Sequence, residues 1–215
     1  RVFLMFDCNK FREIQGYIEK KNNLSKIIAI SKNHPITPVF EAIKCGVRDF
    51  GENKVQEAVK KFEPLIKQYP DISLHLTGPL QTNKVKDALK IFKVFHTLDR
   101  EKLAREFSKH STKTKSKNFF IQVNTGREQS KSGIFPENLK QLFMLCKEEL
   151  KLNIIGLMCI PPINEDPKPH FKLLKEMGDE LHLNEFSMGM SADYKHAIEL
   201  NSTYIRLGTI LFGKR

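Results

Sequence analysis

The chain has 215 residues, of which 40% are hydrophobic and 28% charged, and its formal net charge is +11. These values are typical of a globular protein, and no apolar run reaches the roughly 18 residues that a membrane-spanning helix requires. The excess of Lys and Arg would suit a polyanionic partner, but these residues are spread along the whole chain among acidic ones. We therefore expect no nucleic-acid partner and no membrane partner. The densest basic cluster, residues 109–117, is predicted to be a surface loop.

The four cysteines are Cys8, Cys45, Cys146 and Cys159, and none of them forms a closely spaced pair of the metal-binding or redox type. We expect no disulfide and no metal site, with all four acting as small apolar residues. The apolar run at positions 2–6 is too short for the core of a signal peptide, which takes roughly 7–15 residues. These features favour a cytoplasmic location.

The first 26 residues form a leader, predicted to be helical over 8–21, and the rest of the chain alternates short apolar runs with amphipathic segments. The predicted strands are 27–30, 47–50, 72–77, 94–97, 119–124, 154–160, 185–187 and 203–206. The predicted helices between them are 38–45, 55–68, 83–91, 100–109, 137–150 and 169–181, and one further helix is expected after each of the last two strands.

This alternation amounts to about eight strand–helix units with apolar strands, which is typical of parallel strands buried on both faces. Both an open doubly wound sheet and a closed barrel fit the pattern. Eight units across residues 27–215 take roughly 24 residues each, a suitable length for a compact barrel. The glycine-rich nucleotide motifs of open sheets are absent from the sequence. We therefore predict an α/β fold with a helical leader (1–26) and one (β/α)8 TIM barrel (27–215).

Functional groups in such barrels lie at the carboxyl ends of the strands. Lys32 follows the first predicted strand and precedes a turn-forming stretch, so the mouth of the barrel would partly desolvate its amine. A desolvated lysine is a good nucleophile towards carbonyl groups. By position alone, a lysine that extends into water is the simpler explanation of the residue.

Two glycine-containing turns follow the seventh and eighth predicted strands, at residues 187–191 and 206–209. Glycine permits close approach of a ligand, and the amide groups that begin a helix bind anions. Barrels often bind phosphate at these two turns. The alternative is an ordinary turn in which Ser191 caps the following helix. A nucleophilic lysine opposite a phosphate site suggests pyridoxal 5′-phosphate (PLP).

Several sequence segments then give a more specific indication. The segments are 29–32 (AISK), 50–57 (FGENKVQE), 75–84 (HLTGPLQTNK), 130–133 (SKSG), 156–158 (GLM), 187–191 (SMGMS) with Asp193, and 206–213 (RLGTILFG). In order and spacing they resemble the PLP homeostasis proteins, which are single-domain relatives of the alanine racemase N-terminal barrel, the fold type III of PLP proteins. The likeness runs from about residue 27 to 213. Thr77 and Met188 depart from it, because aliphatic residues are more usual at both places.

The resemblance implies a role for nine residues. Lys32 matches the lysine that holds PLP as an internal aldimine, and Arg206 matches the arginine that faces the pyridine nitrogen. The residues matched to the phosphate are Ser191, Gly208 and Thr209, with the backbone of Gly189 and Met190 nearby, and those matched to the pocket lining are Asn53 and Met158.

The expected function is to hold and deliver PLP inside the cell, without dedicated catalytic residues. An arginine cannot accept the proton of a pyridinium, so the ring would be a weak electron sink. Racemisation also needs a second acid–base group, which alanine racemases take from an additional β domain. The sequence ends nine residues after Arg206, so we expect no such domain and a monomer that makes at most transient contacts with PLP-dependent enzymes. His34, near Lys32, is expected to be a solvated loop residue. The alternatives are a slow PLP-dependent amino-acid racemase and a phosphate-binding barrel without PLP.

Overall fold

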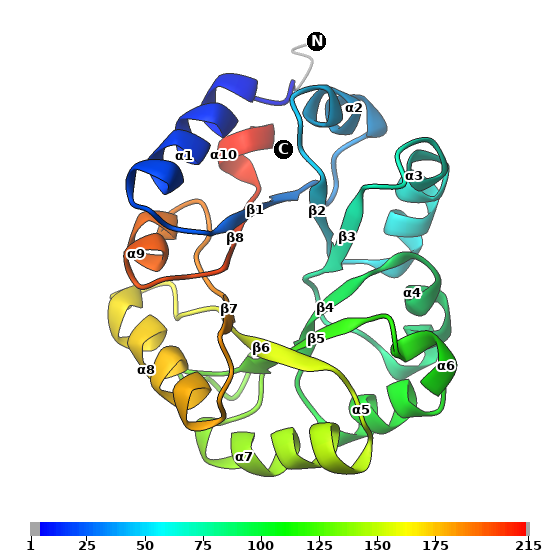
Figure 1. The fold of residues 1–215 in the computed structure, drawn as a ribbon, viewed down its shortest axis with the longest axis vertical. Helices are drawn as coiled ribbons and strands as arrows, with labels where there is room; N and C mark the ends of the chain where they lie inside the picture. Colours follow the sequence, from blue (N-terminus) through cyan, green and yellow to red (C-terminus); the bar gives the residue numbers. More distant parts are fainter. Residues whose placement is uncertain (1–4, 214–215) are drawn as a thin grey trace.

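The computed structural model describes residues 5–213, apart from the side chain of residue 111. Eight parallel strands pair in chain order and β8 pairs with β1, so the sheet closes on itself. Viewed along the barrel axis, the strands form a central ring and the helices surround it (Figure 1). The predicted (β/α)8 barrel is therefore confirmed.

The strands are β1 (Lys26–Ile30), β2 (Asp49–Glu52), β3 (Ser73–Leu76), β4 (Val94–Leu98), β5 (Asn118–Val123), β6 (Ile154–Cys159), β7 (Glu185–Ser187) and β8 (Tyr204–Leu207). The helices are α1 (Cys8–Lys20), α2 (Ile36–Lys44), α3 (Val55–Gln68), the 3-10 turn η1 (Thr82–Lys84), α4 (Val85–Ile91), α5 (Glu101–Ser108), α6 (Ser111–Thr114), α7 (Pro136–Met144), the π-helical turn η2 (Leu145–Glu149), α8 (Pro167–Glu180), α9 (Tyr194–Glu199) and α10 (Thr209–Phe212). Every predicted strand and helix overlaps one of these elements. Among residues 5–213, no helix has the length and apolar character needed to cross a membrane.

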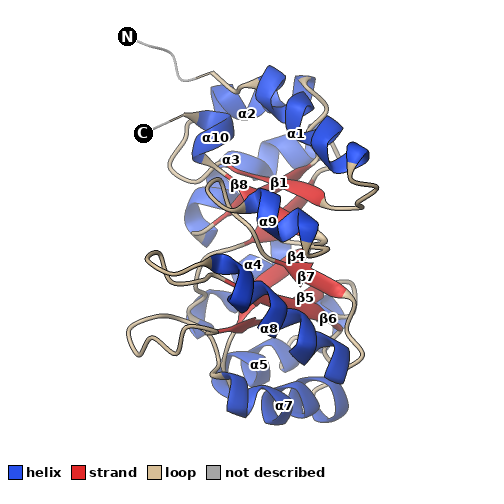
Figure 2. Ribbon diagram, turned by 90° about the vertical axis from the view of Figure 1, so that its left-hand side faces the viewer, coloured by secondary structure: helices blue, strands red, loops and turns tan. Residues whose placement is uncertain are grey.

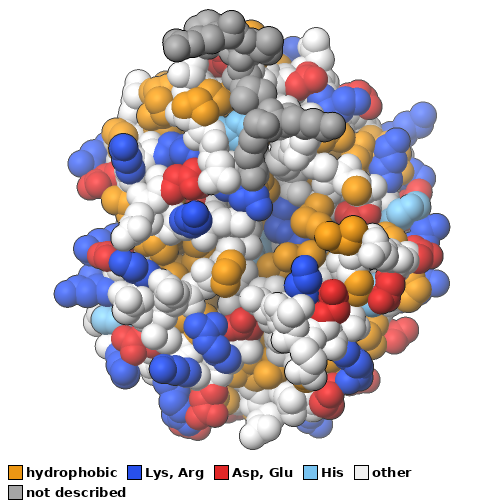
Figure 3. Space-filling model, turned by 180° about the vertical axis from the view of Figure 1, so that it is seen from behind, with side chains coloured by type: hydrophobic (Ala, Val, Ile, Leu, Met, Phe, Trp, Pro, Cys, Tyr) orange, Lys and Arg blue, Asp and Glu red, His pale blue; other side chains and the backbone are white. Residues whose placement is uncertain are grey.

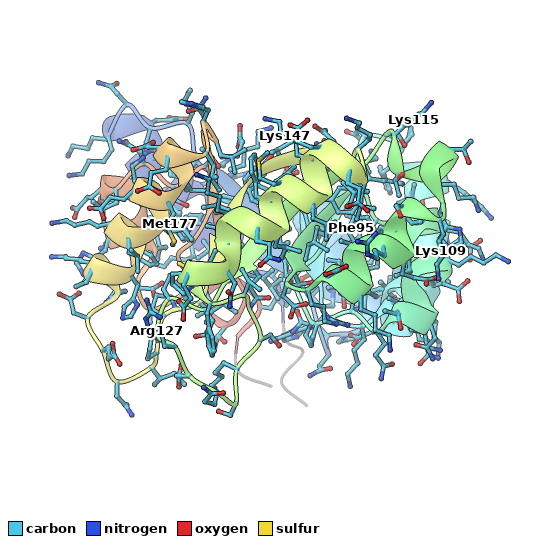
Figure 4. All side chains as sticks on the ribbon, turned by 90° about the horizontal axis from the view of Figure 1, so that it is seen from below. Phe95, Lys109, Lys115, Arg127, Lys147 and Met177 are labelled. Atoms are coloured by element: carbon cyan, nitrogen blue, oxygen red, sulfur yellow. A yellow bond between two sulfur atoms is a disulfide. The ribbon has the colours of Figure 1, made fainter. Side chains whose placement is uncertain are left out.

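The basic cluster at 109–117 was predicted to be a surface loop, and this prediction is wrong in part. The cluster contains the short helix α6, in which the amides of Lys113 and Thr114 both donate to the carbonyl of His110. Thr114 is buried, so the segment has an anchor that a solvated loop would lack. Lys109 and Lys115 lie at the outer edge of the molecule, around α5 and α6 (Figure 4).

Two apolar clusters form the core of the described part of the chain. The larger one lies between the strands and the surrounding helices and includes most of the buried phenylalanines. A smaller cluster of Val94, Phe120 and Met158 lies inside the ring of strands, with Tyr204 packed against it. This separation follows from the strand geometry, because successive side chains point alternately into the barrel and towards the helices. Polar side chains share the barrel interior with the smaller cluster, and they matter for the site described below.

The leader helix α1 packs on the last helix, α10, through the large apolar cluster. Cys8 at the start of α1 forms a disulfide with Cys45, the residue that follows α2, and their Cα atoms are 5.9 Å apart. The expectation of no disulfide is therefore wrong. The two cysteines are 37 residues apart, and no local spacing rule identifies such a pair, because the contact depends on how the helices pack. Cys146 and Cys159 are free and buried, as expected.

Loops project from one end of the barrel, on the left of Figure 2, where α10 also lies. This is the end at which the strands finish and the strand-to-helix loops begin. Arg127, in the loop after β5, and Lys147, in η2, lie at opposite ends of the molecule (Figure 4). The carboxyl ends of the eight strands therefore meet at a single face.

Candidate functional site

A cavity of about 610 Å³ opens at the carboxyl ends of the strands. It is lined by Ile30, Lys32, Asn53, Thr77, Ile160, Met190, Ser191, Ala192, Arg206, Gly208 and Thr209. Figure 3 shows this face of the molecule, which is hollowed near its centre, with Lys and Arg side chains beside the hollow. Seven of the nine residues predicted for the cofactor site line the cavity.

The other two predicted residues, Met158 and Gly189, lie outside the lining. Met158 is fully buried in the barrel interior with Val94 and Phe120, so its side chain lies beneath the cavity. Gly189 has a φ of +95°, and a Cβ there would meet the Cβ of Ala197 at 2.5 Å. The glycine is therefore required by the shape of the turn after β7, whatever binds nearby.

Lys32 is partly buried, and both of its neighbours in the chain are held in place. The hydroxyl of Ser31 donates to Glu52 Oε1 at 2.6 Å. The Ser31 carbonyl accepts a hydrogen bond from Lys61 Nζ at 2.8 Å. On the other side, the amide of Asn33 donates to Glu57 Oε1 at 2.6 Å. The backbone that carries Lys32 is thus fixed from β2 and α3.

Lys61, Glu52 and Glu57 form a buried ion network behind Lys32. Lys61 Nζ lies 2.8 Å from Glu52 Oε1 and 3.1 Å from Glu57 Oε1. Burial raises the pKa of Glu52, although Lys61 and Ser31 act in the opposite direction. Burial opposes ionisation of Glu57 too, but hydrogen bonds from the Asn33 amide and Lys61 outweigh it, so the pKa of Glu57 is lowered. The network therefore depends on the lysine to keep its two carboxylates close together.

His34 is not the solvated residue that was expected, since it is only 4% exposed. Its ring stacks on Phe212 of α10, with the two centroids 5.2 Å apart. The turn after β1 thus folds back onto the last helix, and this contact gives the loop carrying Lys32 a second support.

Arg206 belongs to β8 and points into the barrel, where it is 4% exposed. Its Nη1 donates to the carbonyl and to the hydroxyl of Ser187, each at 2.7 Å, and Nη2 donates to the carbonyl of Cys159 at 2.9 Å. Burial lowers the pKa of Arg206, but a guanidinium stays charged in a protein. Within the described residues, these acceptors use three of its five N–H groups, and Arg206 also lines the cavity.

The turn after β7 is shaped by an aspartate. The Met190 amide donates to the side chain of Asp193, and the Met190 carbonyl accepts from the amides of Asp193 and Tyr194. Helix α9 begins at Tyr194, and its N-cap residue is Asp193. The alternative in which Ser191 caps this helix is therefore wrong. Ser191 and Met190 are instead left at the cavity wall.

Asn53 and Thr77 meet on the opposite wall, where the Thr77 hydroxyl donates to Asn53 Oδ1 at 3.0 Å. A Cβ at Gly78 would lie 2.5 Å from the Asn53 carbonyl oxygen, so glycine is needed there for close packing of the two turns. Thr77 was noted only as a departure from the family pattern, yet it fixes the orientation of the Asn53 amide.

The lining suits a small anionic aldehyde such as PLP. It holds two basic side chains, Lys32 and Arg206, and in the described residues it holds no acidic one. The hydroxyls of Ser191 and Thr209 lie at the same wall, and the first amides of α10 have no acceptor within their own helix. Amine, guanidinium, hydroxyl and amide groups together match an aldehyde, a ring acceptor and a phosphate. In residues 5–213, no group of His, Cys, Asp and Glu side chains is arranged to hold a metal ion.

Sequence reasoning missed the ion network and the polar groups of the barrel interior. Glu52 and Glu57 lie within the quoted segment 50–57, and Lys61 follows Glu57 at the i,i+4 spacing of a helical ion pair, so a signal was present. His75 also lies in a quoted segment, but its partner His96 is 21 residues away, and only the register of β3 and β4 brings the two together.

Comparisons with known proteins agree with this geometry. The model of the family "Alanine racemase, N-terminal domain" matches residues 9–215. The pyridoxal phosphate homeostasis protein of Aquifex aeolicus is 42% identical, covering 97% of this chain and 98% of that protein. The protein of the same name from Vibrio cholerae is 39% identical, over 88% of this chain and 85% of that protein.

Solved structures give the same result. PipY of Synechococcus elongatus, solved without PLP, superposes with a TM-score of 0.87 at 32% identity, covering 96% of this chain and 99% of PipY. PipY solved with PLP bound gives 0.84 at 29% identity, with the same coverage. An alanine racemase of Acinetobacter baumannii, at 19% identity and a TM-score of 0.69, shares the fold, and this chain covers 63% of it. The chain therefore belongs to the alanine racemase N-terminal domain family and, within it, to the pyridoxal phosphate homeostasis proteins.

Proposed function

We propose that this protein binds PLP in the cavity at the carboxyl ends of the strands and holds it as a Schiff base on Lys32. The observation that carries the proposal is the joint placement of Lys32, Arg206 and the turn residues Ser191 and Thr209 around one cavity without an acidic lining residue. Binding of PLP to PipY supports the assignment of the ligand.

Each group has a distinct task in this proposal. The amine of Lys32 condenses with the aldehyde and releases water, while Arg206 faces the ring nitrogen. Ser191, Gly208 and Thr209 receive the phosphate, with the backbone of Met190 nearby and Asn53 beside the ring. Gly189 shapes the phosphate turn, and Met158 supports the floor from below.

The proposed role is storage and delivery of PLP in the cytoplasm by a monomer, with transient contacts to PLP-dependent enzymes. Arg206 cannot take up the ring proton, so the ring would be a weak electron sink, which favours holding the cofactor over transforming amino acids. Transfer of the aldehyde to another amine needs only exchange of the Schiff base or its hydrolysis. Size-exclusion chromatography with light scattering tests the monomer directly.

Borohydride reduction followed by peptide mass spectrometry tests the covalent bond. The expected result is a reduced pyridoxyl adduct on Lys32, and an absorption band of the bound cofactor that Lys32→Ala abolishes. Lys54→Ala is the matched control, because Lys54 is an exposed lysine just after β2 and outside the cavity lining. Binding of PLP without any adduct on Lys32 would contradict the proposal and favour a simple phosphate site.

Solvent deuterium exchange at the α-carbon of a panel of amino acids tests the alternative of a slow racemase. The proposal expects no exchange above that of free PLP. Arg206→Ala should leave the adduct on Lys32 intact while changing the absorption spectrum and weakening PLP binding. If that variant keeps the wild-type spectrum and affinity, the assigned contact with the ring nitrogen is wrong.

A further inference from the structure

A continuous chain of hydrogen bonds crosses the barrel interior from the cavity to the opposite end. Arg206 Nη1 donates to Ser187 Oγ at 2.7 Å, and this hydroxyl lies 2.8 Å from His96 Nδ1. His96 Nε2 lies 2.9 Å from His75 Nδ1, and His75 Nε2 lies 3.0 Å from Asp49 Oδ1. The five residues come from five different strands, and the first four are at most 4% exposed.

The chemistry of the two ends gives the chain a direction. A guanidinium can only donate, so Ser187 Oγ accepts from Arg206 and keeps its own proton free to donate to His96 Nδ1. The carboxylate of Asp49 at the other end decides that this proton is used there, because it accepts a proton from His75 Nε2. His96 then carries its proton on Nε2 and donates it to His75 Nδ1. His75 in turn carries its proton on Nε2 and donates it to the carboxylate of Asp49. All four hydrogen bonds run the same way, from the cation to the anion.

If the hydrogen bonds ran in the opposite direction, from Asp49 towards Ser187, one of the two histidine rings would need a second proton to satisfy them all. If His96 donated from Nδ1 to Ser187, its Nε2 would have to accept from His75 Nδ1. A neutral His75 would then turn a bare nitrogen towards the Asp49 carboxylate at 3.0 Å, which is repulsive. Burial, together with His75 and Arg206, holds the pKa of His96 well below its usual range, which agrees with a neutral ring.

We infer that Ser187, His96 and His75 are positioning residues for Arg206, and that they fix the guanidinium which faces the ligand. This inference deepens the proposed function and rests on it for the identity of the ligand. A hydroxyl that donates its own proton is a better acceptor, so each bond in the chain strengthens the next. Arg206 is thereby held in place at the cavity that it lines.

Packing alone does not account for these polar groups. His96 stacks on Phe120 with the centroids 4.6 Å apart, and Val94 and Met158 fill the adjoining space with apolar atoms. An apolar side chain would therefore suit the volume at position 96. What it would lose is the link between Ser187 and His75.

The first test uses the protein without cofactor and measures the histidine tautomers by two-dimensional ¹H–¹⁵N NMR. The expected result is His96 with its proton on Nε2 and a bare Nδ1, and the same arrangement in His75. Ser187→Ala should move the Nδ1 signal of His96, because that nitrogen loses its donor. Tyr204→Phe is the matched control: the Tyr204 ring lies 5.7–5.9 Å from the rings of both histidines, and its hydroxyl is not one of the links in the chain. A His96 ring protonated on Nδ1 would overturn the inference.

The second test measures PLP affinity and the spectrum of the bound cofactor. Ser187→Ala and His96→Phe should each weaken binding about tenfold, since a hydrogen bond to a charged group is altered. They should also shift the absorption band, while the borohydride adduct on Lys32 still forms. Ser187→Thr keeps the hydroxyl and should restore affinity and spectrum.

The two tests separate this inference from the proposed function. If Ser187→Ala lowers only the melting temperature and leaves PLP affinity and spectrum unchanged, the hydrogen-bond chain contributes to stability alone and the inference fails. If no adduct forms on Lys32 even in the unmodified protein, the proposed function fails, and the NMR experiment still decides the direction of the chain.

Discussion

Replacing Lys61 by methionine should destabilise the protein strongly, although the residue lies outside the cavity lining. Lys61 Nζ donates to Glu52 Oε1, to the Ser31 carbonyl and to Glu57 Oε1, at 2.8, 2.8 and 3.1 Å. The Glu52 side chain is fully buried, so within residues 5–213 the substitution leaves its carboxylate without a cationic partner and with only the hydrogen bond from the Ser31 hydroxyl. Removing one member of a buried ion pair typically costs about 3–5 kcal/mol. For a chain of this length that loss corresponds to a melting temperature lower by roughly 6–20 °C.

The pH dependence of the loss identifies its cause. The pKa of Glu52 is already raised by burial, and Lys61→Met removes the largest opposing influence, so the pKa rises further. A carboxyl whose folded pKa lies above its unfolded one stabilises the fold when protonated, and that stability is lost as pH rises through the folded pKa. The deficit of the variant relative to the unmodified protein should therefore be smaller at pH 5 than at pH 8, as measured by thermal and urea denaturation.

Two further variants make the experiment decisive. Lys67→Met on the same helix removes an exposed pair with Glu63 at 3.8 Å and should cost less than about 1 kcal/mol. Adding Glu52→Gln to Lys61→Met removes the stranded charge and should restore most of the stability. A deficit for Lys61→Met that is equal at both pH values, or that Glu52→Gln does not relieve, would refute the reasoning.

Three other outcomes follow from the fold. Cys8→Ser should remove the disulfide with Cys45 and lower the stability by about 4 kcal/mol, the chain-entropy value for a 37-residue loop. In the unmodified protein, thiol titration after denaturation without reduction should give two free thiols, those of Cys146 and Cys159. Gly78→Ala should lower the melting temperature by several degrees, because its Cβ would overlap the backbone of Asn53. Met158→Ala should lose about 2–5 kcal/mol of stability by denaturant titration, through the cavity it leaves in the barrel interior, yet still form the borohydride adduct on Lys32.

The barrel and most of the cavity lining could be predicted because both depend on local patterns. Short apolar runs alternating with amphipathic segments specify parallel strands and helices, and a closed barrel necessarily brings the carboxyl ends of all strands together. Lys32 and Arg206 thus belong to one site once their strands are assigned. Met158 was placed in the lining by resemblance alone, and its side chain points into the barrel below the cavity, a direction set by strand register.

Contacts set by closure of the barrel were beyond the sequence. Cys8 and Cys45 belong to separate helices, at the start of α1 and just after α2, and His75 reaches His96 because β3 and β4 pair with His75 opposite Val94. A shift of one residue in that register would turn one of the two rings out of the barrel. No spacing in the sequence carries that information, since it depends on the register between paired strands.

The two buried cations beside the cavity are balanced in different ways, and the difference bears on the proposed function. Lys61 contacts two carboxylates directly, so its charge is neutralised within the protein. Arg206 donates to oxygens of Ser187 and Cys159, and it reaches the carboxylate of Asp49 only through Ser187, His96 and His75. Its guanidinium therefore keeps a positive charge beside the cavity, where it favours an unprotonated ring nitrogen. A site built in this way favours retention of PLP over its use as an electron sink. Variants that break the hydrogen-bond chain from Arg206 to Asp49 should therefore change the spectrum of the bound cofactor while its attachment to Lys32 is kept.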